Sequence, residues 1–162
     1  MRLCDTSSST LNPCVYRAST DPGMQAHPLR LCPGDDLRVA VEDALRQRNL
    51  QAAFVVQGIG SLDVAALRFA GAQAPTEIRG DLEILTLAGS VSLDGAHLHM
   101  SIADARGQVF GGHVARGCTV RTTVELLLVS VPGYSFVREL DPRTGYLELL
   151  IRCDGTPQPD SA

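Results

Sequence analysis

The sequence of 162 residues contains no lysine and no tryptophan, and aromatic residues make up only 4% of it. A core must therefore be built from Val, Leu, Ile and Ala, and the hydrophobic content of 44% is sufficient for one. This content excludes global disorder. The length fits a single domain.

Long hydrophobic runs are also missing. No stretch approaches the roughly 18 consecutive apolar residues of a membrane-spanning helix. Residues 1–14, MRLCDTSSSTLNPC, lack the apolar segment of a secretory leader. We therefore expect a soluble, cytoplasmic protein with no membrane partner.

Cysteine residues are few, odd in number and without a C-x-x-C pair, which predicts free thiols rather than a disulfide framework. This pattern argues against a zinc site built from thiolates. The five residues are Cys4, Cys14, Cys32, Cys118 and Cys153.

The charge balance argues against a nucleic-acid-binding protein whose affinity depends on contacts to phosphate groups. The net charge is −4, and the 14 basic residues, all arginines, are scattered from Arg2 to Arg152 without a run. Nucleic-acid-binding domains usually show a basic patch or a high isoelectric point. DNA binding would require that folding gather these arginines on one face.

The chain divides into a central domain and two tails. Residues 1–26 are rich in Ser and Thr and show no hydrophobic period, so we interpret them as a flexible N-terminal tail. An arm that wraps a neighbouring subunit is the alternative. Residues 154–162, with two prolines, are interpreted as a flexible C-terminal tail. The domain is expected at residues 27–153.

Hydrophobic periodicity predicts one helix followed by strands. Between residues 35 and 48 the apolar positions recur with a helical period, at Leu37, Val41, Ala44 and Leu45. Short apolar segments follow, separated by turns such as Asp94-Gly95, a typical hairpin dipeptide. The pattern predicts an α+β fold, with one main helix packed on a predominantly antiparallel β-sheet of about seven strands.

Three of the four histidines fall within seventeen residues. His97 and His99 are two apart on an expected strand, so their side chains project from one face with Cα atoms roughly 6.5–7 Å apart. An antiparallel return would bring His113 back toward them. Gly111 and Gly112 precede it, and paired glycines allow a close backbone approach or a bulge that re-aims a side chain.

The histidine spacing is compatible with two interpretations. Three imidazoles can hold one zinc ion and leave a fourth tetrahedral position open, whereas a strand histidine can also be an ordinary surface residue. For a metal site, Glu125, Asp104 or Asp94 could act as second-shell partner or general base. For Glu125 we favour a strand-face carboxylate that points to solvent, although its apolar neighbours Val124, Leu126 and Leu127 make it a candidate for the site. No catalytic residue can be named from the sequence.

Several motifs, taken in order between about Leu29 and Ile151, make the chain resemble the plants and prokaryotes conserved (PPC) domain, also known as domain of unknown function 296. The motifs are Pro33-Gly34-Asp35-Asp36-Leu37, Gly58-Ile59-Gly60-Ser61-Leu62, LEILTLAGS at residues 82–90, His97-Leu98-His99 and Val109-Phe110-Gly111-Gly112-His113.

The resemblance implies an α+β domain that assembles as a homotrimer. It also implies that His97, His99 and His113 hold a metal ion, with zinc or another divalent metal as the cofactor. Plant members carry a DNA-binding Arg-Gly-Arg-Pro hook and a Gly-Arg-Phe-Glu-Ile-Leu stretch for partner proteins. This chain has no such hook, and its matching stretch at residues 80–85 reads GDLEIL, which weakens the case for DNA.

These observations favour a metal-binding, trimeric domain that acts as a binding or regulatory module and is related to DNA-binding proteins by kinship only. The first alternative is a metal-dependent hydrolase that uses the open position of the three-histidine site to activate water. A direct DNA-binding protein, with arginines gathered by trimerisation, is a weaker alternative. Binding to a protein partner is a further alternative.

Overall fold

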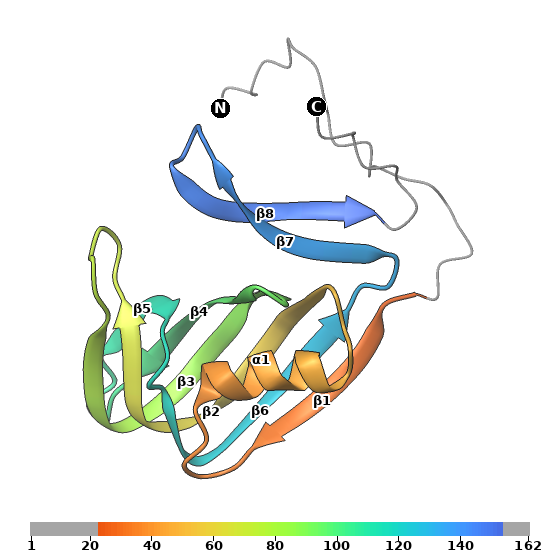
Figure 1. Cartoon of the computed structure of the whole chain (residues 1–162). Coiled ribbons are helices and arrows are strands. Elements are labelled where there is room, and N and C mark those ends of the chain that lie inside the picture. The colour runs from red at the N-terminus through yellow and green to blue at the C-terminus, as the bar shows by residue number, and fades with distance from the viewer. Residues whose placement is uncertain (1–22, 154–162) are drawn as a thin grey trace, which may run out of the picture.

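The computed structural model describes residues 23–153, which form one helix and eight strands (Figure 1). The predicted α+β class is confirmed. In chain order the elements are β1 (Gln25–Leu31), α1 (Leu37–Gln47), β2 (Ala53–Arg68), β3 (Thr76–Ser92), β4 (Gly95–Ala103), β5 (Val109–Val114), β6 (Thr119–Ser130), β7 (Tyr134–Asp141) and β8 (Tyr146–Cys153).

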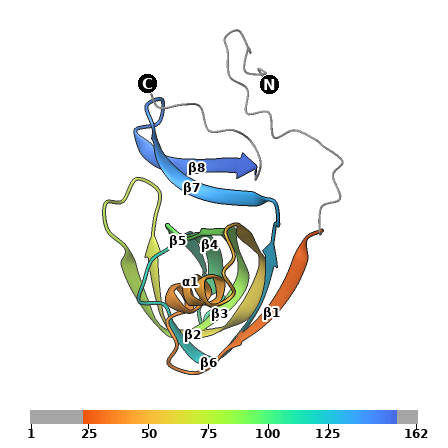
Figure 2. The same cartoon turned by 45° about the vertical axis from the view of Figure 1, so that its right-hand side comes forward.

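Six strands form an antiparallel sheet in the order β1-β6-β2-β3-β4-β5. The sheet curls so far that its last strand returns to β2, where Leu67 pairs with Val114 and Arg68 with His113. Figure 2 shows the strands curving around α1. This closure fixes β5 between β4 and β2, and it therefore fixes the position of His113.

The helix begins and ends at residues that cap it. The Asp36 carboxylate accepts hydrogen bonds from the backbone N–H of Val39 (3.0 Å) and of Gly117 (2.6 Å), so it satisfies a free helix donor and also anchors the loop before β6. Asn49 adopts a positive φ of 53°, as expected of the residue that follows a helix. The predicted range 35–48 differs from the observed one only by such cap residues.

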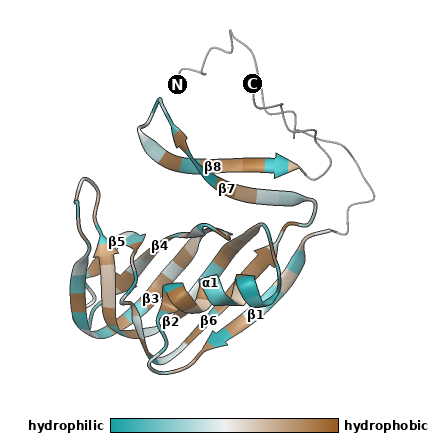
Figure 3. Ribbon diagram, in the orientation of Figure 1, coloured by the Kyte–Doolittle hydropathy of each residue, from teal (hydrophilic) through white to brown (hydrophobic). Residues whose placement is uncertain are grey.

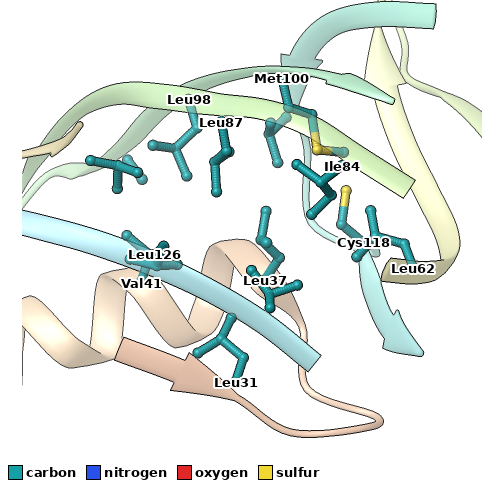
Figure 4. Close-up of a cluster of buried hydrophobic side chains, with 14 of the residues drawn as sticks. Leu31, Leu37, Val41, Leu62, Ile84, Leu87, Leu98, Met100, Cys118 and Leu126 are labelled. Atoms are coloured by element: carbon teal, nitrogen blue, oxygen red, sulfur yellow. The ribbon is translucent and has the colours of Figure 1, made fainter. Parts of the chain in front are cut away.

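The core lies between α1 and the concave face of the sheet. Leu37, Val41 and Leu45 of α1 have no exposed surface, and Ala44 is also buried, which confirms the predicted apolar face. Figure 4 shows the helix side chains pointing toward those of the strands, and Figure 3 shows hydrophobic and hydrophilic residues alternating along the strands. Residues that alternate with the core positions lie on the outer face of the sheet.

A buried carboxylate ties α1 to the start of β4. Glu42, only 2% exposed, accepts hydrogen bonds from Arg38 (3.0 Å), from Arg116 (2.9 Å) and from the backbone N–H of Ala96 (3.2 Å). Burial raises the pKa of Glu42, but the hydrogen bonds outweigh it and hold the pKa below its usual value. The charged carboxylate thus holds in place the residue that precedes His97.

Strands β7 and β8 form a separate two-stranded hairpin beyond one end of the main sheet (Figure 1). Phe136, which is buried, packs edge-on against Phe54 of β2 at a centroid distance of 5.1 Å. Its backbone N–H donates to the Gln51 carbonyl. In the turn that joins β3 to β4, the Asp94 carboxylate accepts the Arg138 backbone N–H at 2.8 Å, which holds the hairpin beside this turn, close to His97.

The predicted tails fall mostly on residues 1–22 and 154–162, which lie outside the described residues. Strand β1 begins at Gln25, two residues before the expected start of the domain.

Cysteine usage differs in part from the prediction. Cys32 and Cys118 are free thiols, whereas Cys153 is disulfide-bonded, so the prediction of free thiols throughout is wrong for this residue. An odd count with scattered spacing does not reveal that folding gives Cys153 a disulfide partner.

Within residues 23–153, no helix has both the length and the apolar character that crossing a membrane requires.

Candidate metal centre

The alternation of β4 places two histidines side by side on the outer face of the sheet. Ala96, Leu98 and Met100 are buried against the core, so His97 and His99 project from the other side. Their Nε2 atoms lie 3.0 Å apart. The prediction that both side chains share one face is confirmed.

The third histidine reaches the pair from the neighbouring strand. His113 of β5 is the direct cross-strand partner of His99, and its ring centroid lies 5.1 Å from that of His97 and 5.5 Å from that of His99. One nitrogen from each ring can be chosen so that all three lie within 4.8 Å of one another. The expected antiparallel return is therefore present.

The two glycines before His113 allow this approach. A Cβ atom on Gly112 would lie 2.9 Å from the carbonyl oxygen of Arg68, a contact that a side chain cannot make without a shift of backbone. At Gly111 the nearest atom, the Met100 carbonyl oxygen, would be 3.3 Å away. Gly112 is thus the tighter position, and it lets β5 lie between β4 and β2.

The site favours neutral imidazoles. Burial, followed by the nearby charges of His97, Arg68 and Arg38, lowers the pKa of His113 to about 4. Burial also lowers the pKa of His97, with Arg138 as the next cause and Glu148 opposing it. Since a neutral imidazole has a free lone pair, both rings are ready to bind a metal near pH 7.

Two further observations fit a metal ion. The Nδ1 atom of His113 is buried without a hydrogen-bond partner in the described part of the chain, and metal coordination satisfies such an atom. Zn–N bonds of about 2.0–2.1 Å in a tetrahedron place ligand nitrogens roughly 3.3 Å apart, a separation that small side-chain rotations would produce here. The three imidazoles could hold the ion and leave a position for another ligand.

Of the carboxylates predicted beside the site, Asp94 lines a hollow with His97 and His113, whereas Glu125 and Asp104 do not. Glu125 is exposed on β6, where it is the cross-strand partner of Arg30 on β1 and of Ile59 on β2. Strands β2 and β3 separate β6 from β4. At a spacing of about 4.8 Å per strand this is roughly 14 Å. Its apolar neighbours Val124 and Leu126 turn into the core, which leaves Glu125 on the opposite side. The solvent-facing interpretation of Glu125 is the one the structure supports.

Neither aspartate joins the histidine cluster. Asp104 follows β4 and accepts the backbone N–H groups of Arg106 and Gln108, both at 2.9 Å, so it shapes the turn to β5. Asp94 accepts the backbone N–H of Arg138 at 2.8 Å and anchors the hairpin. Asp104 thus shapes the connection between the two histidine strands, whereas Asp94 holds the hairpin and lines a small hollow together with His97 and His113.

Two residues beside the site could not be identified from the sequence. Arg138 of β7 and Glu148 of β8 line a cleft of about 450 Å³ together with His97 and His99. Both lie at least 25 residues from the nearest histidine along the chain, and no spacing pattern connects them to it. A hairpin that docks through Phe136 and a few hydrogen bonds leaves no periodic pattern in the sequence.

Comparisons with known proteins place this geometry in a family. The profile of the Plants and Prokaryotes Conserved (PCC) domain matches residues 18–132. A Synechococcus protein named Bifunctional protein GlmU is 49% identical over 132 residues, which are 81% of this chain and 21% of that protein. The chain thus spans about a fifth of the curated relatives it matches.

Solved structures share the fold over most of their length. A hypothetical protein of Salmonella enterica is 38% identical with a TM-score of 0.79, covering 82% of this chain and 96% of that one. A metal-containing protein of Archaeoglobus fulgidus is 28% identical, with a TM-score of 0.68 and coverages of 78% and 93%. A Ralstonia eutropha protein, provisionally named DNA-binding, is 26% identical, with a TM-score of 0.66 and coverages of 80% and 90%.

The profile match covers well over half of the chain and includes every element from β1 to β6. The chain therefore belongs to the Plants and Prokaryotes Conserved domain family.

Proposed function

We propose that this domain binds one divalent metal ion, zinc by preference, on His97, His99 and His113 and acts as a binding or regulatory module. The convergence of three histidine nitrogens within 4.8 Å carries the proposal. Imidazole ligands suit zinc and its neighbours among the transition metals. The Archaeoglobus relative, which is a metal-containing protein, supports the same assignment.

The decisive experiment is metal analysis of the purified protein with a matched control. We expect about one ion per chain in the wild type and in His27→Ala, because His27 of β1 bonds to Ser130 and not to the cluster. His99→Ala should retain little metal. A wild type without stoichiometric metal, or a His99→Ala variant that keeps it, would contradict the proposal.

The role as a module draws support from the curated relatives. The matched segment is only about a fifth of a protein named bifunctional, so most of such a chain lies outside this domain. A domain attached to a larger protein in this way is suited to binding or regulation. A cytoplasmic location stays a prediction.

Assembly as a homotrimer is part of the proposal. Val56, Ile59 and Leu85 are 53%, 51% and 44% exposed on the neighbouring strands β2 and β3, and apolar residues gathered on a surface are typical of an interface. Light scattering should give the mass of three chains for the wild type. Ile59→Asp should dissociate the trimer, whereas Leu140→Asp at the hairpin tip should not. A monomeric wild type would contradict trimer formation.

A metal-dependent hydrolase is the second candidate, and the cleft beside the histidines favours it. Glu148 is a carboxylate that lines this cleft with His97 and His99. A general base that takes a proton from metal-bound water must lie close to the metal ligands in this way. The test is metal-dependent hydrolysis of activated esters. Activity that Glu148→Gln abolishes without loss of metal would favour the enzyme, and inactivity of the metal-loaded wild type would count against it.

DNA is the least supported partner. The provisional name of the Ralstonia relative suggests it, while the net charge of −4 opposes it. If DNA is bound through phosphate contacts, the affinity should fall steeply between 50 and 200 mM salt. Absence of a fluorescence-anisotropy change at low salt would end this hypothesis.

A further inference from the structure

Two hollows meet at His97, and both are lined by Arg138. The larger, about 450 Å³, lies between the sheet and the β7–β8 hairpin and includes His99. The smaller, about 150 Å³, includes His113, Arg38 and the Asp94 carboxylate, so the larger hollow is the one with more room for an anion. The larger volume falls within the range of about 300–1,000 Å³ typical of small-molecule sites. A ligand bound beside the histidines would therefore meet Arg138.

Arg138 is held beside His97 by one side-chain and one backbone hydrogen bond. Its Nη2 donates to the Ser90 hydroxyl at 2.8 Å, and Ser90 is the direct cross-strand partner of His97. Cβ atoms of such a pair lie about 4.5–5.5 Å apart. The Arg138 backbone N–H is fixed separately by the Asp94 carboxylate at 2.8 Å. The position of the guanidinium is thus set by the fold.

This guanidinium has donors to spare. Within the described residues, no carboxylate lies within ion-pair distance of Arg138, whereas Arg38 is paired with Glu42 and Arg152 with Glu139. A guanidinium carries five N–H donors and never loses its charge near neutral pH. One donor is given to Ser90, so a planar acceptor such as a carboxylate could take two others.

Charge also favours an anion at this place. A divalent ion on three neutral imidazoles keeps its full charge, and Arg138 beside it is a second cation. Two cations at short range repel one another. An anion between them relieves this repulsion and can occupy the open coordination position at the same time.

The walls of the larger hollow narrow the class of anion. Phe54, Ala88 and Leu149 offer apolar surface, while Glu148 supplies one negative charge. The Glu148 carboxylate accepts the Thr144 hydroxyl at 3.1 Å. A ligand with an apolar body and one negative charge matches these walls, whereas a multiply charged anion would be repelled by Glu148.

We propose that the cleft between β4 and the β7–β8 hairpin binds a small monocarboxylate with an apolar body, whose carboxylate lies between Arg138 and the metal ion. The proposal rests on the proposed metal site. It assigns Arg138 as a residue that recognises the ligand.

The experiment uses the full chain loaded with Co(II), whose visible absorption bands report on its ligands. Benzoate is the probe, and benzyl alcohol is the uncharged counterpart. We expect benzoate to change the bands of the wild type in a saturable manner, and benzyl alcohol to leave them unchanged. Arg138→Gln should bind Co(II) normally and weaken the apparent benzoate affinity about tenfold or more, as expected for loss of a charged, two-donor contact. Inorganic phosphate should bind more weakly than benzoate.

Two variants separate recognition from a structural role. Arg143→Gln removes the same charge from the hairpin tip, where Arg143 pairs with Asp141, and should bind benzoate within about twofold of the wild type. Ser90→Ala removes the hydrogen bond to Arg138 but keeps the guanidinium, so it should weaken binding less than Arg138→Gln. The hairpin stays docked in all variants through Phe136 and Asp94.

The outcomes distinguish this inference from the metal site on which it rests. A chain that binds no Co(II) overturns both. A chain that binds Co(II) but shows no response to benzoate, or responds equally in Arg138→Gln, overturns the carboxylate site alone. Tighter binding of phosphate than of benzoate overturns the assigned ligand class.

Discussion

At the scale of single residues, Glu42 shows how one buried charge can position a distant site. Its carboxylate joins Arg38 and Arg116 to the backbone of Ala96, next to His97. Burying a charge is costly unless it is paired and hydrogen-bonded. The network therefore stabilises the fold most when Glu42 and all of its hydrogen-bond donors are present.

Glu42→Gln should lower the free energy of unfolding by about 2 kcal/mol at pH 7, because a neutral amide leaves the Arg38 guanidinium with weaker compensation. Since the folded pKa of Glu42 lies below its ordinary value, its contribution is present above the unfolded pKa of about 4.3 and is lost as the pH falls through the folded pKa. Urea unfolding at pH 7 and at pH 3.5 measures both effects. A wild type and variant that differ equally at the two pH values would contradict this account.

At the scale of elements, strand β5 depends on glycine for its place between β4 and β2. Gly112→Ala should destabilise the fold by about 2 kcal/mol and weaken metal binding, because its Cβ would press on the Arg68 carbonyl at 2.9 Å and displace His113. Gly111→Ala is the matched control, with a milder contact of 3.3 Å. Thermal unfolding measures the stability of the two variants, and metal titration measures their affinity for the ion. Equal effects of both substitutions would show that the close approach to β2 is not what limits the strand.

The β7–β8 hairpin is an element held mainly by one aromatic contact. Phe136→Ala should detach it, because the variant loses the packing on Phe54. Backbone amides of β7 and β8 should then exchange hydrogen faster, while those of the main sheet stay protected. Unchanged exchange in the hairpin would mean that the bonds of Arg138 to Ser90 and Asp94 suffice to hold it.

At the scale of the whole molecule, the parts of the site that could be predicted are those encoded locally. His97 and His99 share a face through strand alternation, and His113 follows a short return marked by glycines, so the three could be grouped from the sequence. Glu125 was a candidate because of its apolar neighbours, yet alternation sends Val124 and Leu126 inward and Glu125 outward. The cleft depends on the docking of a distant hairpin, which no local pattern encodes.

The same geometry links metal binding to the stability of the entire sheet. The histidines lie on β4 and on β5, the strand that closes the sheet against β2, so an ion bound to all three would cross-link the closure. Free zinc at 100 times its dissociation constant should stabilise the fold by about 2.7 kcal/mol, if the unfolded chain does not bind it. Chelation should reverse the accompanying rise in Tm. His27→Ala should show the same rise as the wild type and His113→Ala almost none. A similar rise in His113→Ala would mean that the ion stabilises the protein from another place.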